Sequence, residues 1–325
     1  MRRARARALA NVALVKYFGK RDLALNLPAA GSLSLALEPL STTTAVELDG
    51  SLADDVVTLD GEAADQRFAA RVSGFLDLLR EIAGTTDRAR VETSNSFPTA
   101  AGLASSASGF AALAVAGSAA LDVDLGEGEL SALARRGSGS AARSIPGGVA
   151  LWRAGSRADG TDSYARRVAD PGDIDLRMVI GVADAGPKPI GSTAAMELTR
   201  ETSPYYRAWI DSVDQDLPAA VSAIEARDLP RLGEIAERNA LRMHATALAA
   251  DPGIVFWSST TIEALHLVRR LRGQGLGVWF TCDAGPQPKV LCGSGDEAAA
   301  ARALGELPGI ERVIRCELGG GAELL

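Results

Sequence analysis

The chain has 325 residues, of which 47% are hydrophobic and 23% charged, with a formal net charge of −7. This length is enough for one large or two medium-sized domains, and we expect two. The acidic balance excludes a general nucleic-acid binder, because that class needs a cationic surface to displace counterions from phosphate.

The cysteines and the N-terminus favour a cytoplasmic protein without a metal site or a membrane partner. Three cysteines with no C-x-x-C spacing, and only two histidines, argue against structural zinc and favour a reducing compartment. The start, MRRARARALANVALVKYF, imitates a signal peptide, but its apolar run contains Asn11 and ends at Lys16 without a cleavage-like site. We therefore predict a first β-strand there. No other segment approaches the ~20 apolar residues that span a bilayer.

The first half of the chain is predicted to be rich in strands. Segments 31–37, 42–48 and 56–59 are apolar or alternate polar with apolar residues, and we expect them to be consecutive antiparallel strands. The other elements expected in this half, in chain order, are a helix over about 64–83, a strand at 89–94 and an Ala-rich helix from about 103 to 120.

The second half gives a regular series of elements. Thr260 and Glu263 form a predicted capping box, and Gly273 and Gly275 supply the helix stop. The order of elements is that of a split βαβ, ferredoxin-like sheet with extra helices in its first crossover. No repeat or long linker separates the halves, so we expect a cleft between them. The expected elements are strands at 176–184, 276–282, 288–292 and 311–318, and helices near 205–228, 230–248, 260–272 and 295–306.

The segment PTAAGLASSASG (98–109) places small residues between a predicted strand and a predicted helix. Backbone N–H groups and the hydroxyls of Ser105, Ser106 and Ser108 would surround a helix N-terminus, where the helix dipole and unpaired donors favour an anion. The segment matches neither G-x-x-x-x-G-K-[ST] nor G-x-G-x-x-G. A small-residue helix packed tightly on a sheet would have the same composition, and composition alone does not separate the two interpretations.

Two cation-bearing stretches allow a functional and a structural interpretation. Lys16, Tyr17 and Lys20 put two cations and a phenol within a few residues, which suits a substrate phosphate. Lysines at a strand end are also common as solvated edge charges.

The stretch RRGSGSAARS offers the hydroxyls of Ser138 and Ser140 and the guanidinium of Arg143, which can hold a carboxylate or phosphate by a bidentate pair. A Gly-rich turn with a surface arginine is the structural alternative. Asp283 follows the predicted buried strand LGVWFTC and precedes Ala-Gly-Pro, so its carboxylate should stand at a strand end above a sharp turn. A carboxylate in such a place is commonly a turn or helix cap.

PTAAGLASSAS resembles the phosphate loop, P-x-x-x-G-L-[AG]-S-S-A, of the superfamily that contains galactokinase, homoserine kinase, mevalonate kinase and phosphomevalonate kinase (GHMP kinases). Within that superfamily the match is closer to the diphosphomevalonate decarboxylases. Six further stretches resemble that family in the same order, and together they cover nearly the whole chain: NVALVKYFGKRD (11–22), LPAAGSLSLAL (27–37), RRGSGSAARSIPGG (135–148), GSTAAMELTRETSP (191–204), MHAT (243–246) and TCDAGPQPKV (281–290).

The resemblance implies an α+β protein with the two-domain GHMP-kinase fold. Residues 1–175 are expected to form an α/β domain like the second domain of ribosomal protein S5, which carries the ATP phosphate loop. Residues 176–325 are expected to form the ferredoxin-like split βαβ domain that carries the catalytic aspartate. The family also suggests a homodimer.

The resemblance further implies roles for individual residues. Asp283 becomes the catalytic aspartate near a tertiary hydroxyl of the substrate, Arg143 holds the substrate carboxylate with Asn11 beside it, and Lys16 completes the catalytic set. His244, in MHAT, is interpreted as a structural histidine. The expected substrate-binding residues are Asn11, Lys16, Tyr17, Lys20, Ser138, Ser140 and Arg143. The expected ATP-binding residues are Pro98, Ala101, Gly102, Leu103, Ala104, Ser105, Ser106, Ser108, Lys188, Ser192 and Thr193.

The implied reaction is the ATP-dependent decarboxylation of mevalonate 5-diphosphate to isopentenyl diphosphate, with ATP as co-substrate and Mg²⁺ as cofactor. Gly31, Phe18 and the pair Gln287-Pro288 depart from the family pattern, which bears on substrate detail more than on reaction class. Retention of Asp283 and Arg143 argues against a relative that only phosphorylates the C3 hydroxyl. It leaves mevalonate 5-phosphate open as the substrate.

A catalytically silent nucleotide-binding regulator is an alternative from a different class of protein. Such a protein would be expected to lose Asp283, Arg143 or the Ser105–Ser106 pair, and the chain retains all of them.

Overall fold

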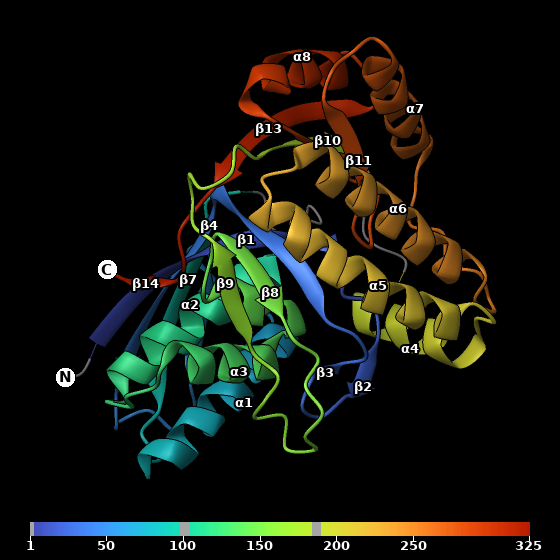
Figure 1. Cartoon of the computed structure of the whole chain (residues 1–325). Helices are drawn as coiled ribbons and strands as arrows, with labels where there is room; N and C mark the ends of the chain where they lie inside the picture. Colours follow the sequence, from blue (N-terminus) through green and yellow to red (C-terminus); the bar gives the residue numbers. More distant parts are fainter. Residues whose placement is uncertain (1–2, 98–104, 184–189) are drawn as a thin grey trace.

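The computed structural model describes residues 3–97, 105–183 and 190–325 (Figure 1). The predictions that fall on residues 98–104 and 184–189 lie outside this described part. The N-terminal half contains, in chain order, β1 (Arg3–Val15), β2 (Lys20–Asp22), β3 (Leu27–Pro28), β4 (Ser32–Leu48), β5 (Val56–Leu59), β6 (Glu62–Ala63), α1 (Gln66–Ala83), β7 (Ala89–Asn95), α2 (Ser105–Ala120), α3 (Glu127–Gly137), the 3₁₀ helix η1 (Gly139–Ser144), β8 (Val149–Trp152) and β9 (Ala165–Ala169).

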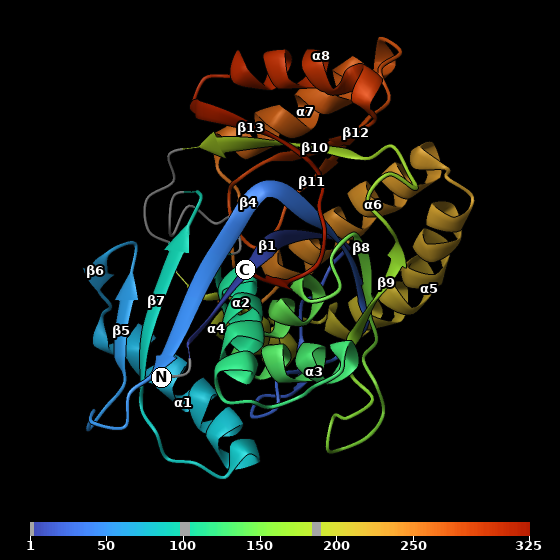
Figure 2. The ribbon, with the colours of Figure 1, turned by 90° about the vertical axis from the view of Figure 1, so that its left-hand side faces the viewer.

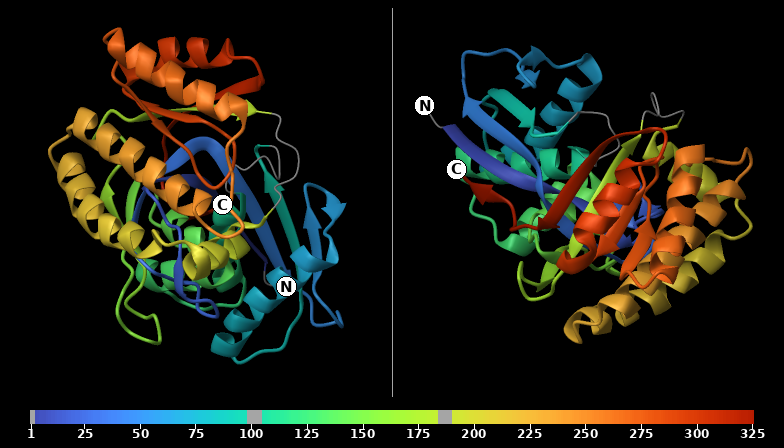
Figure 3. Two further views of the ribbon diagram at one scale, coloured as in Figure 1. Left: turned by 90° about the vertical axis from the view of Figure 1, so that its right-hand side faces the viewer. Right: turned by 90° about the horizontal axis from the view of Figure 1, so that it is seen from above.

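The second half begins with β10 (Arg177–Ala183) and contains the remaining helices. Predicted helices near 205–228 and 230–248 are confirmed as a pair that runs side by side along one flank of the molecule (Figures 1 and 3). The elements after β10 are α4 (Ser192–Thr202), α5 (Tyr206–Glu225), α6 (Leu229–Leu248), α7 (Ser259–Gly273), β11 (Val278–Thr281), β12 (Lys289–Cys292), α8 (Ser294–Gly305), β13 (Ile310–Leu318) and β14 (Glu323–Leu324).

The expectation of separate antiparallel strands at 31–37 and 42–48 was wrong. Both segments belong to one strand, β4, which is visibly curved (Figure 2). Proline cannot donate to a sheet ladder, so Pro39 suggested a strand end. In the structure this proline lies where the pairing of β4 with β1 shifts from Leu9↔Ser41 to Asn11↔Ala36, so the strand continues across it.

The strand at 56–59 is confirmed, but its expected pairing was also wrong. β5 pairs in parallel with β7, and β7 in turn pairs antiparallel with the second part of β4. The crossover through α1 makes this arrangement possible, because a parallel connection needs a long excursion between the two strands. The helix itself begins after its N-cap Asp65 and ends at Gly84, whose φ of 66° is left-handed.

The C-terminal strands form the predicted ferredoxin-like arrangement. Their order is β11-β12-β10-β13, and all three neighbouring pairs are antiparallel. β13 also pairs with β4 at Leu318↔Leu37, which joins the C-terminal strands to the N-terminal sheet. Helices α7 and α8 cover the outer face of these strands (Figure 1).

One helix cap differs from the prediction. Helix α7 begins after Ser258, and the capping box is formed by Ser258 and Thr261 instead of Thr260 and Glu263. The side chain of Thr260 instead donates to the carbonyl of Pro308 at 3.3 Å. Residues 258–261 are four consecutive hydroxyl residues, so tertiary contacts decide which hydroxyl becomes the cap.

The core positions the site by packing the two halves against each other. One cluster of buried apolar side chains joins β1 and β4 to α5, α6 and β10, and it includes Leu14, Leu35, Trp209 and Met243. Helix α2 packs on β1 and β4 from the other side. Because the same cluster holds the end of β1 and helix α6, residues from both halves are fixed in register around the end of β1.

Candidate active site

Asp283 and Lys16 meet at the junction of the two halves of the chain. Asp283 follows β11, and Lys16 follows β1 directly. Lys16 Nζ donates to Asp283 Oδ1 at 2.8 Å and to the carbonyl of Ala13 at 2.7 Å. Its backbone N–H donates to Asn239 Oδ1 on α6 at 2.8 Å. The lysine is therefore fixed at both ends, and it holds one oxygen of the acid.

Lys289 is a second cation beside Asp283, and it was not among the site residues predicted from the sequence. Its Nζ lies 3.3 Å from Asp283 Oδ2. The sequence contains one sign of this contact, the turn after Asp283. A hairpin that closes at this turn brings residue 289 back beside Asp283. The structure pairs Lys289 with Thr281, close to Asp283 in the chain.

The two lysines keep Asp283 charged. Burial raises the pKa of Asp283, but the ion pairs with Lys16 and Lys289 outweigh burial and hold the pKa well below its usual range. Burial also lowers the pKa of Lys16, and the neighbouring Asp283 opposes that effect. An ionised carboxylate flanked by two ammonium groups is a hydrogen-bond acceptor and a fixed negative charge, but a weak base.

Arg143 lies on η1 in a buried pocket of neutral groups. Its Nε donates to Asn11 Oδ1 at 3.1 Å and its Nη1 to Ser32 Oγ at 3.1 Å. The guanidinium carbon is 5.9 Å from the ring centre of Tyr17 and 5.7 Å from that of Trp152. Burial lowers the pKa of Arg143 to about 10, so the group stays cationic at neutral pH. Neither hydrogen-bond partner carries a charge, which suits a guanidinium that receives an anion.

The predicted substrate residues on the Gly-Ser stretch lie beside Tyr17. A Cβ on Gly139 would lie 2.5 Å from Tyr17 Oη, so only glycine permits this approach. Ser138 Oγ is 3.4 Å from Ser140 Oγ and 3.4 Å from Ser106 Oγ. Burial raises the pKa of Tyr17, whose hydroxyl has no hydrogen-bond partner among the described residues. The serines thus connect the Arg143 pocket with the start of α2.

Lys20 reaches across to α4. Its Nζ donates to Thr193 Oγ1 at 3.2 Å and to Asn26 Oδ1 at 2.6 Å. Burial lowers the pKa of Lys20, and the nearby carboxylate of Glu197 opposes that effect. The structure brings Lys20 and Thr193 together, while Ser192 is the exposed first residue of α4.

The start of α2 borders a cavity of about 270 Å³ between the β4–β7 strands and helices α1 and α2. Ser105 and Ser106 line it, and Phe68 and Leu113 contribute apolar walls. Ser108 turns inward: its Oγ is 2.6 Å from Thr42 Oγ1 and donates to the Ser105 carbonyl at 3.3 Å. The predicted ATP residues Pro98, Ala101, Gly102, Leu103, Ala104 and Lys188 lie outside the described residues.

His244 supports the segment that carries the acid. Its Nε2 lies 3.3 Å from the carbonyl of Cys282, and its ring packs on Phe256 and Trp257. Burial lowers the pKa of His244 to about 3, so the ring is neutral and can donate this hydrogen bond. This placement agrees with the structural interpretation of the histidine.

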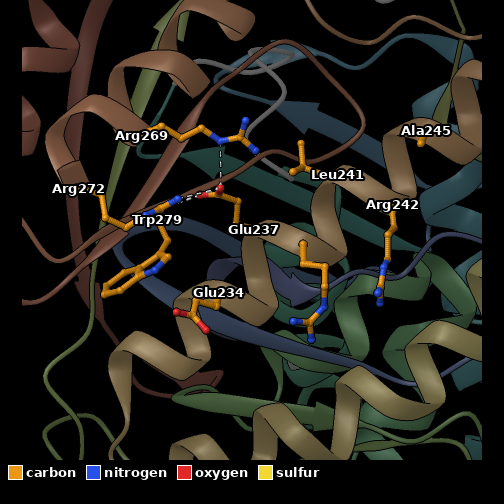
Figure 4. Close-up of a pocket in the computed structure, with 9 residues that line it drawn as sticks. Glu234, Glu237, Leu241, Arg242, Ala245, Arg269, Arg272 and Trp279 are labelled. Carbon is orange, nitrogen blue, oxygen red and sulfur yellow. Dashed lines mark hydrogen bonds and ion pairs between the residues drawn. The ribbon is translucent and has the colours of Figure 1, made fainter.

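A second cavity, of about 500 Å³, lies on α6 and α7 (Figure 4). We call it the arginine groove; it is lined by Glu234, Glu237, Arg238, Leu241, Arg242, Ala245, Arg269, Arg272 and Trp279. Glu237 forms ion pairs with Arg269 and Arg272, and Asp216 behind the groove pairs with Arg238 and Arg242. Glu237 and Asp216 are referred to below as the groove carboxylates.

The described residues show neither a metal-binding cluster nor a membrane-spanning helix. No group of three or more His, Cys, Asp or Glu side chains there is arranged to hold a metal ion. Within the same residues, no helix has the length and apolar composition to cross a membrane.

The ferredoxin-like sheet, the helix that starts at Ser105 and the acid that faces the junction define an enzyme of the GHMP-kinase fold. Residues 8–165 match the diphosphomevalonate decarboxylase-like N-terminal domain, and residues 178–315 match the mevalonate 5-diphosphate decarboxylase C-terminal domain. The chain belongs to the diphosphomevalonate decarboxylase family.

Individual relatives agree with this assignment. Diphosphomevalonate decarboxylase mvd1 of Aspergillus fumigatus is 38% identical over 89% of this chain and 76% of its own length. Phosphomevalonate decarboxylase of Haloferax volcanii is 34% identical over 84% of this chain and 82% of its own. The structure of MDDEF in complex with MVAPP, AMPPCP and magnesium superposes with a TM-score of 0.93, at 42% identity, over 99% of this chain and 98% of that one.

Proposed function

We propose that this protein catalyses the ATP-dependent decarboxylation of mevalonate 5-diphosphate to isopentenyl diphosphate, ADP, phosphate and CO2. The observation that carries the proposal is the arrangement around Asp283. Among the residues that the structure describes, two lysines and Arg143 accompany Asp283, and the site therefore suits an anionic substrate. Both halves of the chain contribute to it, as expected for a reaction between two substrates.

Arg143 is proposed to bind the substrate carboxylate, with Asn11 holding the guanidinium plane. A planar guanidinium matches a carboxylate bidentately, and Nε and Nη1 are already oriented by neutral partners. Lys16 is proposed to contact the substrate as well as the acid. The diphosphate would then be bound by Tyr17, Lys20, Ser138 and Ser140, whose polar atoms gather between Arg143 and α4.

Asp283 is proposed to orient the C3 hydroxyl by accepting its hydrogen bond. A carboxylate with so low a pKa is a weak base, and a loose phosphoryl-transfer transition state demands little deprotonation of the attacking oxygen. The hydroxyl oxygen forms the bond to phosphorus, and ADP leaves. The hydroxyl becomes acidic as that bond forms, and its proton moves along the hydrogen bond to Asp283 and from there to solvent.

The second step breaks two σ bonds and forms two π bonds, one in the alkene and one in CO2. The C3–O bond breaks with its electron pair on the departing phosphate, and the pair of the C–CO2 bond becomes the new alkene. Phosphorylation is needed because a tertiary alcohol is a poor leaving group. Arg143 aligns the carboxylate while its low-exposure pocket excludes water.

ATP is proposed to place its nucleoside in the cavity beside α2 and its phosphates at the helix N-terminus. Ser105 and Ser106 border both places, and helix N-termini favour anions. Thr193 and Ser192 lie on the N-terminus of α4, on the side of Lys20. The contributions of Pro98, Ala101, Gly102, Leu103, Ala104, Ser108 and Lys188 remain part of the same proposal.

Mg²⁺ fits this donor set as an ion carried by the nucleotide. The described residues hold no acidic cluster, and Mg²⁺ usually keeps several waters and binds substrate phosphates. The hydroxyls of Ser105 and Ser106 are the protein oxygens available beside those phosphates. When bound, Mg²⁺ would neutralise phosphate charge during transfer.

The division into domains at 175 and 176, the homodimer and the cytoplasmic location are further proposals. The two family matches on either side of residues 166–177 support the division. The three cysteines are buried thiols, which suits a reducing compartment. Sedimentation equilibrium of the purified chain tests the dimer directly.

A parallel assay of ADP and CO2 tests the proposed reaction. With mevalonate 5-diphosphate and ATP, we expect one CO2 for each ADP. A kinase of the C3 hydroxyl would release ADP without CO2, and a silent nucleotide-binding protein would release neither. The same assay with mevalonate 5-phosphate should give a much lower kcat/KM; a higher value would reassign the substrate to the monophosphate.

A further inference from the structure

Lys289 occupies an unusual place for a lysine. It opens β12, which lies between β11 and β10, and it pairs with Thr281 on one side and Ile180 on the other. Its side chain is 2% exposed. Burying an ammonium group in a sheet loses hydration, and an apolar side chain of similar volume packs at least as well in many such sites. Stability therefore gives no reason for a lysine at this position.

The contacts of the ammonium group point to Asp283. Lys289 Nζ is 3.3 Å from Asp283 Oδ2, while Lys16 Nζ is 2.8 Å from Oδ1. Lys289 also donates to the carbonyl of Gln287 at 3.3 Å, which fixes its own position. Because each lysine holds a different oxygen, the plane of the carboxylate is fixed. With Lys16 alone, the carboxylate would be free to rotate about its Cβ–Cγ bond.

We propose that Lys289 is a positioning residue for the reaction: it locks the second oxygen of Asp283, so that the carboxylate meets the C3 hydroxyl in one orientation. This inference rests on the proposed function and deepens it. Lys289 acts through Asp283, whose side chain is 32% exposed, whereas the lysine itself is almost inaccessible.

The charged and titratable groups that face Asp283 decide what removal of Lys289 does. Among the described residues they are Lys16 from the end of β1, Lys289 from β12, Arg143 from η1 and His244 from α6. His244 is neutral, so Lys16 and Arg143 would be the remaining cations of this described set. Burial then meets less opposition, and the pKa of Asp283 rises toward its usual range, because one close opposite charge has been removed.

The test is Lys289→Met, with kcat and KM measured at pH 7.5. We expect kcat to fall by about 10-fold to 100-fold, the range typical of a misplaced catalytic group. KM should change less than kcat, because Lys289 acts through Asp283, and Lys289→Arg should return kcat toward wild type. The control is Arg315→Met. Arg315 lies on β13 of the same sheet and pairs with Glu297 of α8 at 2.7 Å, and the kcat of this variant should match that of wild type.

A second measurement needs no reaction. The ¹³Cγ chemical shift of Asp283 reports its pKa in the protein alone, and it should titrate at higher pH in Lys289→Met than in wild type. Lys289→Gln serves the same purpose if the methionine variant does not fold. Unchanged kcat and an unchanged titration in a folded variant would overturn the proposal. If wild-type protein released no CO2, the proposed function would fail, and the titration would still decide whether Lys289 governs Asp283.

Discussion

Asp283 and the groove carboxylates all pair with cations, but the exposure of the acid and of its cations is reversed between the two places. Glu237 and Asp216 are 9% and 3% exposed, and their four arginine partners are 33–48% exposed. Asp283 is 32% exposed, whereas Lys16 and Lys289 are each 2% exposed. In the groove the acids are covered and the cations face solvent. At the junction the cations are covered and the acid is open.

This difference in exposure separates the carboxylates that support the fold from the carboxylate that is proposed to act in the reaction. Glu237 accepts the backbone N–H of Phe280 on β11 at 3.1 Å, and Asp216 accepts from Asn239 Nδ2 at 3.0 Å. Asn239 in turn accepts the backbone N–H of Lys16. The groove carboxylates thus hold the framework behind the site. The side chain of Asp283 stays partly exposed, which is what a group that meets substrate requires.

The largest effect on turnover is expected for Lys16→Met, which removes a buried cation beside the partly exposed Asp283. We expect turnover to fall by about 10²-fold, the scale of one lost electrostatic contact in an active site. The midpoint of denaturant unfolding should change little, because the partly exposed Asp283 keeps Lys289 as a partner and methionine has no ammonium group to bury. A large loss of stability at near-normal turnover would assign Lys16 to the framework.

Glu237→Gln tests the other side. Losing a buried charge that accepts from arginines and a backbone N–H should lower the free energy of unfolding by about 2 kcal/mol. Turnover per folded molecule should stay within about threefold of wild type at saturating substrate. Urea unfolding and a single-point assay on the same preparation check both; a selective loss of turnover would place Glu237 in the chemistry.

His244 gives a pH-dependent prediction. Its pKa is lowered to about 3 in the folded protein, so between that value and about 6.5 the unfolded chain binds more protons. Stability therefore falls as the pH falls through this window, by about 1.4 kcal/mol per unit well below 6.5. His244→Gln should remove that part of the slope. Unfolding curves at pH 7, 6 and 5 for both proteins provide the measurement, and an equal slope would contradict it.

The smallest effect is expected at the exposed cations. Arg242 is 43% exposed and pairs with Asp216 at 3.2 Å, while Arg238 remains on the same carboxylate. Arg242→Met should change the unfolding free energy by no more than about 1 kcal/mol. Its turnover should equal that of wild type, and it is the matched control for Lys16→Met. Loss of activity in Arg242→Met would mean that the groove does more than support the site.

Much of this arrangement could be predicted from the sequence, for identifiable reasons. The ferredoxin-like order followed from the order of helix and strand patterns. The same patterns placed Asp283 at a strand end above a turn, and the family resemblance made it the catalytic candidate. The resemblance singled out Lys16 and Arg143, and the structure places Lys16 against Asp283 across 267 residues of sequence. The order of the motifs along the chain does not show that Lys16 and Asp283 are in contact.

The parts that sequence missed depend on register and on tertiary contacts. Lys289 looked like the ordinary start of a strand, and only the β11–β12 register brings it back to the acid. The continuity of β4 across Pro39 depends on its partner strands, since the local sequence signals a break. Solvent exposure likewise depends on tertiary structure. The sequence alone does not show that Lys16 is buried and Arg242 is exposed.

The most direct test of the central claim is a single-turnover comparison of wild type and Asp283→Asn with carboxyl-labelled mevalonate 5-diphosphate and ATP. The asparagine keeps the size of the side chain and removes its charge. We predict that the variant binds both substrates with nearly unchanged affinity and releases ADP and CO2 at least ~10²-fold more slowly. Release of CO2 at the wild-type rate would contradict the role of Asp283 as the open acid of the active site.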